Sequence, residues 1–150
     1  MIKIIKAKEE DMPEVARLFR TARESQLPYL PTLHTPQEDV SFFREKVLSR
    51  QTVYILREDG IKLVGFIAFD SDWSHHLYLL PELTGHGLGT QLMKFAKKDS
   101  KHLQLWVFKR NERAINFYQK HKFKITKETD GSANEENEPD VLMEWVKGKK

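Results

Sequence analysis

Residues 77–90 read LYLLPELTGHGLGT and join a hydrophobic strand to an amphipathic helix through a loop with glycine at positions 85, 87 and 89. Glycine leaves the backbone N–H groups of such a loop free of side-chain obstruction. These groups also lie at the N-terminus of a helix, where the helix dipole is positive. The loop is therefore predicted to bind a phosphate-type anion.

The glycine spacing differs from the two common nucleotide signatures. A P-loop ends in Gly-Lys-Ser/Thr, whereas Gly89 is followed here by Thr90-Gln91. A dinucleotide fingerprint needs glycine where Thr90 stands, and it follows the first strand of a βαβ unit. Taken alone, the pattern fits a ligand-free glycine turn as well as an anion site.

The periodicity of apolar residues predicts the element order β-α-α-β-β-β-α-β-α-β-β. Asn111 is predicted to cap the last helix, and Glu58-Asp59-Gly60 to form a hairpin turn. We expect an α/β fold over 1–150 as a single domain, with a mixed, mostly antiparallel central sheet and helices on both faces. The predicted strands are 2–7, 52–57, 62–69, 77–80, 103–108, 123–127 and 141–146, and the predicted helices are 11–22, 37–49, 88–99 and 111–120.

The composition is that of a soluble globular protein. The chain has 150 residues, is 39% hydrophobic and 31% charged, and carries a formal charge of +3. This charge is too small to indicate nucleic-acid binding, and no apolar run reaches membrane-spanning length. The absence of cysteine excludes disulfides, thiolate metal sites and cysteine nucleophiles. We expect a cytoplasmic protein with no nucleic-acid or membrane partner.

Two blocks of the sequence resemble the GCN5-related N-acetyltransferases (GNAT family). The first is the strand with Pro81-Glu82, followed by Gly85-His86-Gly87-Leu88-Gly89, which is similar to the family's [Arg/Gln]-x-x-Gly-x-[Gly/Ala] motif. The second runs from Leu105-Trp106-Val107 to Phe123 and is similar to L-x-V followed by N-x-x-A-x-x-F-Y-x-K-x-G-F.

The resemblance implies transfer of an acetyl group from acetyl-coenzyme A to an amine, without a covalent enzyme intermediate. It assigns Tyr118 as the general acid that protonates the leaving thiolate. Tyr118 shares a helical stripe with Asn111 and Ala114, although a core tyrosine would show the same spacing. The residues predicted to bind the cofactor are Leu77, Tyr78, Leu79, Gly85, His86, Gly87, Leu88, Gly89, Thr90 and Asn111.

Three positions depart from the family pattern. Thr84 replaces the usual Arg or Gln of the glycine motif, Lys122 replaces the glycine before Phe123, and Trp106 stands where some relatives have a glutamate base. Thr84 and Trp106 motivate an alternative function, a non-catalytic coenzyme A-binding sensor or interaction module. The general base is left open among Glu82, His75, His76, Asp70 and water.

The acceptor is expected to be a primary amine of a small molecule or peptide. Tyr29 and His34, in the proline-rich segment 25–36, and Glu82 are the predicted substrate-side residues, with simple packing of the loop as an equal alternative. No metal site is predicted, because the histidines lack paired ligand spacing. The resemblance leaves a homodimer open, since relatives are often dimers.

Overall fold

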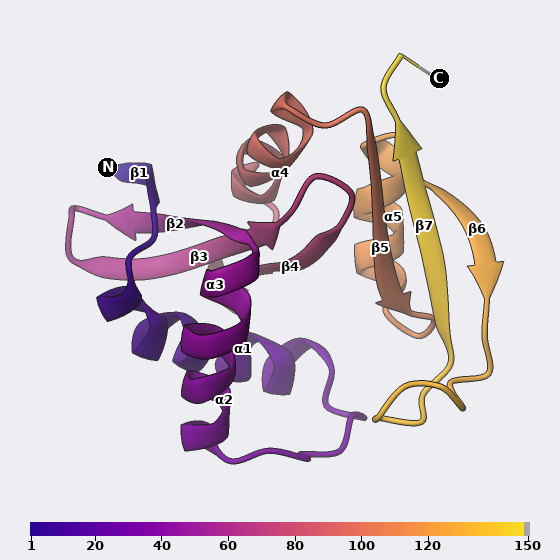
Figure 1. Ribbon diagram of the computed structural model, residues 1–150, viewed down its shortest axis with the longest axis horizontal. Coiled ribbons are helices and arrows are strands. Elements are labelled where there is room, and N and C mark those ends of the chain that lie inside the picture. The colour runs from indigo at the N-terminus through magenta and orange to yellow at the C-terminus, as the bar shows by residue number, and fades with distance from the viewer. Residues whose placement is uncertain (149–150) are drawn as a thin grey trace.

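Two antiparallel sheets form the centre of the computed structural model, which describes residues 1–148 (Figure 1). The first has the order β1-β2-β3-β4 and the second β5-β7-β6. The predicted α/β architecture with antiparallel sheets is confirmed. The strands are β1 (Ile2–Lys6), β2 (Thr52–Glu58), β3 (Lys62–Phe69), β4 (Ser74–Leu79), β5 (His102–Phe108), β6 (Lys124–Glu128) and β7 (Asp140–Val146).

The two sheets meet at one parallel bridge, between Trp73 and Gln104. The Gln104 N–H donates to the Asp72 carbonyl at 2.8 Å. Beyond this bridge, no strand pairing joins β4 to β5 within the described residues. The predicted central sheet is therefore split in two, and β4 keeps one edge free of any neighbouring strand.

Helices cover both faces of the first sheet (Figure 1). Thr35 caps α2 by accepting from the Glu38 N–H, while the Glu38 carboxylate accepts from the Thr35 N–H. The helix predicted over 37–49 is found as α2, a π-helical turn and α3, which follow one another without a break. The helical elements are Glu9–Asp11 (3₁₀), α1 (Met12–Gln26), α2 (Pro36–Phe42), Phe43–Val47 (π), α3 (Leu48–Arg50), Pro81–Leu83 (3₁₀), α4 (Leu88–Lys98) and α5 (Glu112–Lys120).

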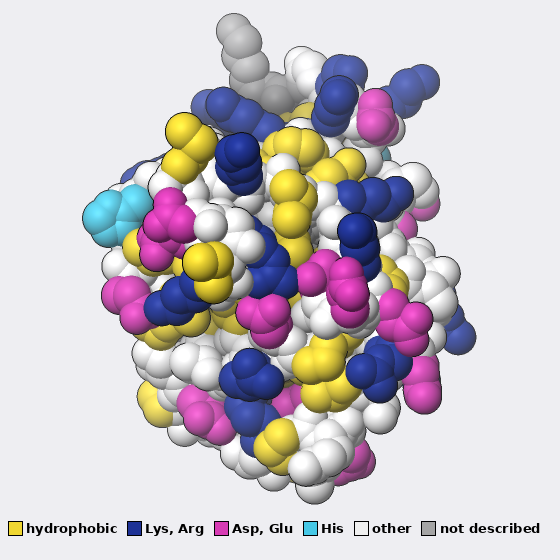
Figure 2. All heavy atoms as spheres, turned by 90° about the vertical axis from the view of Figure 1, so that its left-hand side faces the viewer, with side chains coloured by type: hydrophobic (Ala, Val, Ile, Leu, Met, Phe, Trp, Pro, Cys, Tyr) yellow, Lys and Arg dark blue, Asp and Glu magenta, His cyan; other side chains and the backbone are white. Residues whose placement is uncertain are grey.

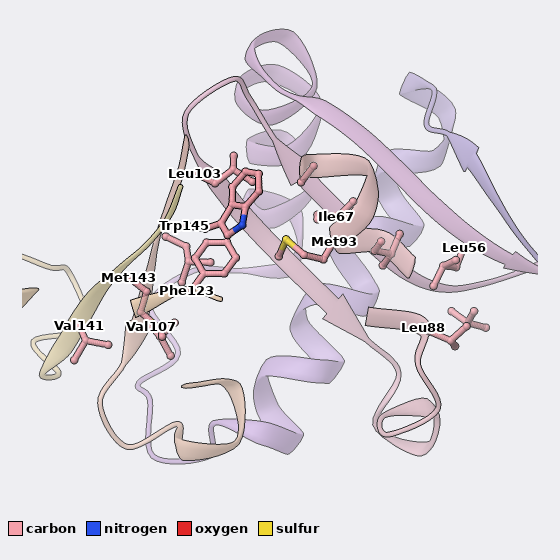
Figure 3. Packing of buried hydrophobic residues seen from close by; sticks show 14 residues of the cluster. Leu56, Ile67, Leu88, Met93, Leu103, Val107, Phe123, Val141, Met143 and Trp145 are labelled. Atoms are coloured by element: carbon pink, nitrogen blue, oxygen red, sulfur yellow. The ribbon is translucent and has the colours of Figure 1, made fainter. Parts of the chain in front are cut away.

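Alternating side chains of the first sheet enter two separate clusters. Ile55 and Phe66 pack beneath α1 and the π-helical turn. Leu56 and Ile67 point to the opposite face, where they join α4 and the second sheet. Figure 3 shows Met93 of α4 lying among residues from both sheets. Because α4 bridges the sheets, its N-terminus and the glycine loop are held at the junction between them.

The surface seen from the side of β1 carries interspersed charges. Lys and Arg side chains alternate with Asp and Glu over this face (Figure 2). In the part of the chain that the structure describes, no helix combines the length and apolar character needed to cross a bilayer.

Candidate functional site

A groove of about 800 Å³ lies between the end of β4, the glycine loop and α5. It also reaches Ser25 and Gln26 at the C-terminal end of α1. Segments that lie far apart in the sequence therefore share one site. Of the predicted residues, the groove is lined by Leu77, Leu79, Gly85, Gly87, Gly89, Thr90, Asn111 and Tyr118.

The glycine loop adopts a conformation that L side chains rarely take. Gly85 has φ of 83° and Gly87 has φ of 82°. Gly87 is also the residue that precedes α4, and a Cβ built on it would meet nothing within 4 Å. The loop thus presents bare backbone to the groove at the start of a helix, as anion binding requires.

Gly89 has a different role from the other two glycines. A Cβ built on Gly89 would lie 3.2 Å from the Phe117 ring of α5. This glycine lets α4 and α5 approach closely, so it sets the width of the groove rather than the conformation of the loop.

α5 forms the opposite wall of the groove. The Asn111 side chain accepts a hydrogen bond from the Ala114 N–H at 3.2 Å and so caps the helix. Tyr118 packs edge-on against Phe117 and Phe123, with ring centroids 5.2 and 5.6 Å apart. Burial raises the pKa of Tyr118, with a smaller contribution from Tyr78. The Tyr118 hydroxyl therefore stays protonated at neutral pH.

Three predicted cofactor-binding residues, Tyr78, His86 and Leu88, are not part of the groove lining. Tyr78 alternates to the other face of β4, where its ring lies 5.2 Å from that of Phe19. Leu88 is buried in the hydrophobic cluster between the first sheet, α4 and the second sheet, and His86 is exposed.

The predicted substrate-side residues do not line the groove. The Arg110 guanidinium stacks over Tyr29, with its central carbon 3.9 Å from the centroid of the Tyr29 ring. His34 Nε2 lies 3.0 Å from Glu135 Oε1, which raises the pKa of His34 above its ordinary value. Glu82 is exposed on the 3₁₀ turn that follows β4.

The connection between α1 and α2 meets the connection between β6 and β7 (Figure 1). Arg23 Nη2 donates to Glu136 Oε2 at 2.7 Å, and both side chains are largely covered. The acidic segment 128–140 therefore pairs with basic side chains of this chain, a role that its composition alone did not reveal.

None of the side chains considered for the general base lies in the groove lining. Asp70 Oδ2 pairs with His75 Nε2 at 2.8 Å, at the bend between β3 and β4. His76 is surrounded by aromatic rings, and burial lowers its pKa to about 3. Trp106 is 46% exposed on the second sheet.

The groove also contains residues that the sequence did not single out. They include the cations Arg113 and Lys120, and the lining contains no carboxylate. One feature of the sequence could have drawn attention to Arg113. It is a cation in the first turn of a predicted helix, where the positive end of the helix dipole disfavours it. Among residues 1–148, no group of three or more His, Cys, Asp or Glu side chains is arranged to hold a metal ion.

The sequence was compared with models of known protein families. The model described as the acetyltransferase (GNAT) family matches residues 16–123, which is more than half of the chain. The chain belongs to the GNAT acetyltransferase family. The match includes β4, the glycine loop, α4 and α5, and thus most of the groove lining. The predicted assignment to acetyl-coenzyme A-dependent N-acetyltransferases is confirmed.

Relatives of this GNAT protein occur in bacteria and archaea. It is 26% identical over 144 residues to the peptidyl-lysine N-acetyltransferase YiaC of Escherichia coli, with 95% of each chain covered. It is 30% identical over 135 residues to an uncharacterized N-acetyltransferase of Archaeoglobus fulgidus, covering 78% of this chain and 89% of the relative.

A solved structure supports the same fold. The PaiA N-acetyltransferase from Thermoplasma acidophilum, crystallised in complex with coenzyme A, superimposes with a TM-score of 0.75 at 24% identity. The alignment covers 97% of this GNAT chain and 99% of that protein.

Proposed function

We propose that this protein transfers the acetyl group of acetyl-coenzyme A to a primary amine of a peptide or small molecule, by direct attack within a ternary complex. The observation that carries the proposal is the groove that joins the bare glycine loop to Tyr118. The relative PaiA was crystallised with coenzyme A, and YiaC is named for lysine side chains of peptides. A peptide lysine is therefore the first acceptor to test.

The loop is suited to a pyrophosphate. Its backbone N–H groups from Gly85 to Thr90 lie at the N-terminus of α4, and Arg113 and Lys120 add positive charge to the groove. In the part of the chain that the structure describes, the lining contains no carboxylate to repel an anion. These features support binding of the nucleotide end of the cofactor.

The free edge of β4 is suited to the pantetheine arm. Within residues 1–148, β4 pairs with β3 on one side and, past the bridge at Trp73, with no strand on the other. The backbone at Leu77 and Leu79 can therefore pair with the amides of the arm as a neighbouring strand would. The split between the sheets gives the arm a place that a continuous sheet would fill.

Tyr118 is assigned as the donor of a proton to the thiolate that leaves when the amine attacks the thioester. Its raised pKa keeps the hydroxyl protonated but makes it a weaker acid. Burial shifts the pKa of a thiol in the same direction. Because the chain has no cysteine, it has no thiol that could take up the acetyl group as a covalent acyl-enzyme.

The test is release of coenzyme A thiol by the purified protein with acetyl-coenzyme A and a panel of amines that includes a lysine peptide. We expect acceptor-dependent release that falls at least tenfold in Tyr118→Phe, because general acid catalysis is worth about 10²–10⁴ in rate. Tyr54→Phe is the control, since Tyr54 packs against Phe95 outside the groove lining.

The outcomes separate the two functional hypotheses. Equal turnover of Tyr118→Phe and the unchanged protein would remove Tyr118 from the mechanism. Binding of coenzyme A without turnover on any amine would instead favour the non-catalytic sensor.

A further inference from the structure

We propose that Arg113 of α5 provides the guanidinium that the glycine motif lacks at position 84, and that it binds the pyrophosphate of coenzyme A. The inference rests on the proposed function. It adds one cofactor-binding residue, and it makes Thr84 a positioning residue rather than a lost contact.

The geometry places Arg113 over the glycine loop. Arg113 Nη2 donates to Thr84 Oγ1 at 2.7 Å, and it lies 4.0 Å from the position of a Cβ on Gly85. The Thr84 hydroxyl in turn donates to the Pro81 carbonyl at 2.9 Å. The hydroxyl therefore has a fixed orientation, with its lone pair directed at the guanidinium.

Arg113 is free to bind an anion. Within residues 1–148 its hydrogen bond to Thr84 uses one N–H, and no carboxylate forms an ion pair with it. Five other arginines each pair with a carboxylate of this chain: Arg20, Arg23, Arg44, Arg57 and Arg110. A guanidinium has five N–H donors, so Arg113 keeps four for a ligand.

The position of Arg113 has a local cost. It is the second residue of α5, which begins at Glu112, and a cation there is disfavoured by the helix dipole. Bound phosphate oxygens beside the guanidinium would compensate this cost through charge-assisted hydrogen bonds. The groove lining offers no acidic side chain that could do so.

The pyrophosphate is the part of coenzyme A that this geometry selects. The Arg113 guanidinium lies beside the glycine loop, with Nη2 hydrogen-bonded to Thr84 Oγ1, whereas the other groove cation, Lys120, is at the opposite end of α5. The inference therefore predicts that Arg113 recognises a group that coenzyme A and dephospho-coenzyme A share and that pantetheine lacks.

The experiment measures dissociation constants of coenzyme A, dephospho-coenzyme A and pantetheine by calorimetry. We expect Arg113→Ala to weaken binding of both nucleotide ligands by about tenfold, typical of losing a charge-assisted hydrogen bond. Pantetheine affinity should not change. Thr84→Val, which removes the oxygen that accepts from Arg113, should weaken binding of the same two nucleotide ligands by a smaller factor.

Two further variants serve as rescue and control. Thr84→Arg in the Arg113→Ala background restores a guanidinium to the loop and should recover most of the affinity. Arg17→Ala removes an exposed charge on α1 outside the groove lining and should leave all three constants unchanged. Circular dichroism of each variant checks that the fold is retained.

Each contrary result has a distinct meaning. A change of less than twofold in Arg113→Ala would overturn this inference while leaving the proposed function intact. A loss for coenzyme A but not for dephospho-coenzyme A would also overturn it, because the contact would then be to the 3′-phosphate. No binding of coenzyme A by the unchanged protein would overturn both.

Discussion

His76 and Tyr118 show how burial sets the protonation state of single residues near the groove. The pKa of His76 is lowered to about 3 by burial, with smaller contributions from His75 and Arg23. A histidine with this pKa is neutral at physiological pH and too weak a base to take a proton from an ammonium group. The environment of His76 therefore argues against one of the bases that the sequence left open.

The lowered pKa of His76 makes a prediction for acid stability. The unfolded chain binds a proton at His76 below pH 6.5, whereas the folded chain does so only near pH 3. The contribution of neutral His76 to the free energy of unfolding is thus fully present above pH 6.5. It is lost as the pH falls below 6.5, at no more than about 1.4 kcal/mol per pH unit. Replacement by an uncharged ring removes the dependence.

We therefore expect the melting temperature of the unchanged protein to fall more steeply between pH 6.5 and 4 than that of His76→Phe. Thermal unfolding across this range measures the difference. Parallel pH profiles for the unchanged protein and His76→Phe would contradict the lowered pKa.

Among the elements, the glycine loop and α4 carry the largest share of the proposed site. The loop's positive φ angles are a local property that glycine spacing predicts well. The free edge of β4 was not predictable in this way, because it depends on how far β5 pairs along β4. The sequence predicted the strands but had no signal for the split between them.

Helix α5 shows the same limit of prediction from sequence for individual side chains. Asn111 and Tyr118 could be predicted because they lie on one stripe and match a family block. The place of Arg113 in the groove could not be predicted, since an exposed arginine on a helix is usually solvated. Its hydrogen bond to Thr84 joins positions 29 residues apart and becomes visible only once α4 and α5 are packed.

Gly87→Ala tests the loop as an element. Alanine at φ of 82° is strained, and we expect a loss of about 1–2 kcal/mol in the free energy of unfolding. The methyl group would also project into the open space where an anion is proposed to bind. Affinity for coenzyme A, measured by calorimetry, should therefore fall as well.

Gly60→Ala is the matched control for this substitution. Gly60 has φ of 71°, nothing lies within 4 Å of a Cβ built on it, and it belongs to the distant hairpin turn between β2 and β3. It should lose similar stability with unchanged affinity for coenzyme A. Equal loss of affinity in both variants would mean that the effect is general strain rather than a blocked site.

Across the whole molecule, ion pairs connect the N-terminal third to the acidic segment near the C-terminus. Arg23 and Glu136 are 113 positions apart, yet their side chains are only 21% and 11% exposed. The sequence shows a run of acidic residues in this segment but not the partners of their carboxylates. Which charges pair across such a distance follows from the fold and cannot be read from charge pattern alone.

Breaking this pair should destabilise the protein. Arg23→Met leaves the Glu136 carboxylate largely covered and without its guanidinium, so we expect a loss of about 1–3 kcal/mol in urea unfolding. The double variant Arg23→Met with Glu136→Leu should recover much of this loss, because neither charge then remains unpaired.

The exposed pair of Lys109 and Glu128 provides the comparison. Their side chains are each 58% exposed, and Lys109→Met should cost less than about 1 kcal/mol. If Arg23→Met cost no more than Lys109→Met, the ion pair between α1 and the β6–β7 connection would not contribute to stability.

The most direct test of the whole account is a crystal structure of the protein with coenzyme A. We predict that the pyrophosphate lies within hydrogen-bond distance of the backbone N–H groups between Gly85 and Thr90, with the thiol end beside Tyr118. Coenzyme A bound away from the loop, or a pyrophosphate with no contact to these N–H groups, would contradict the account.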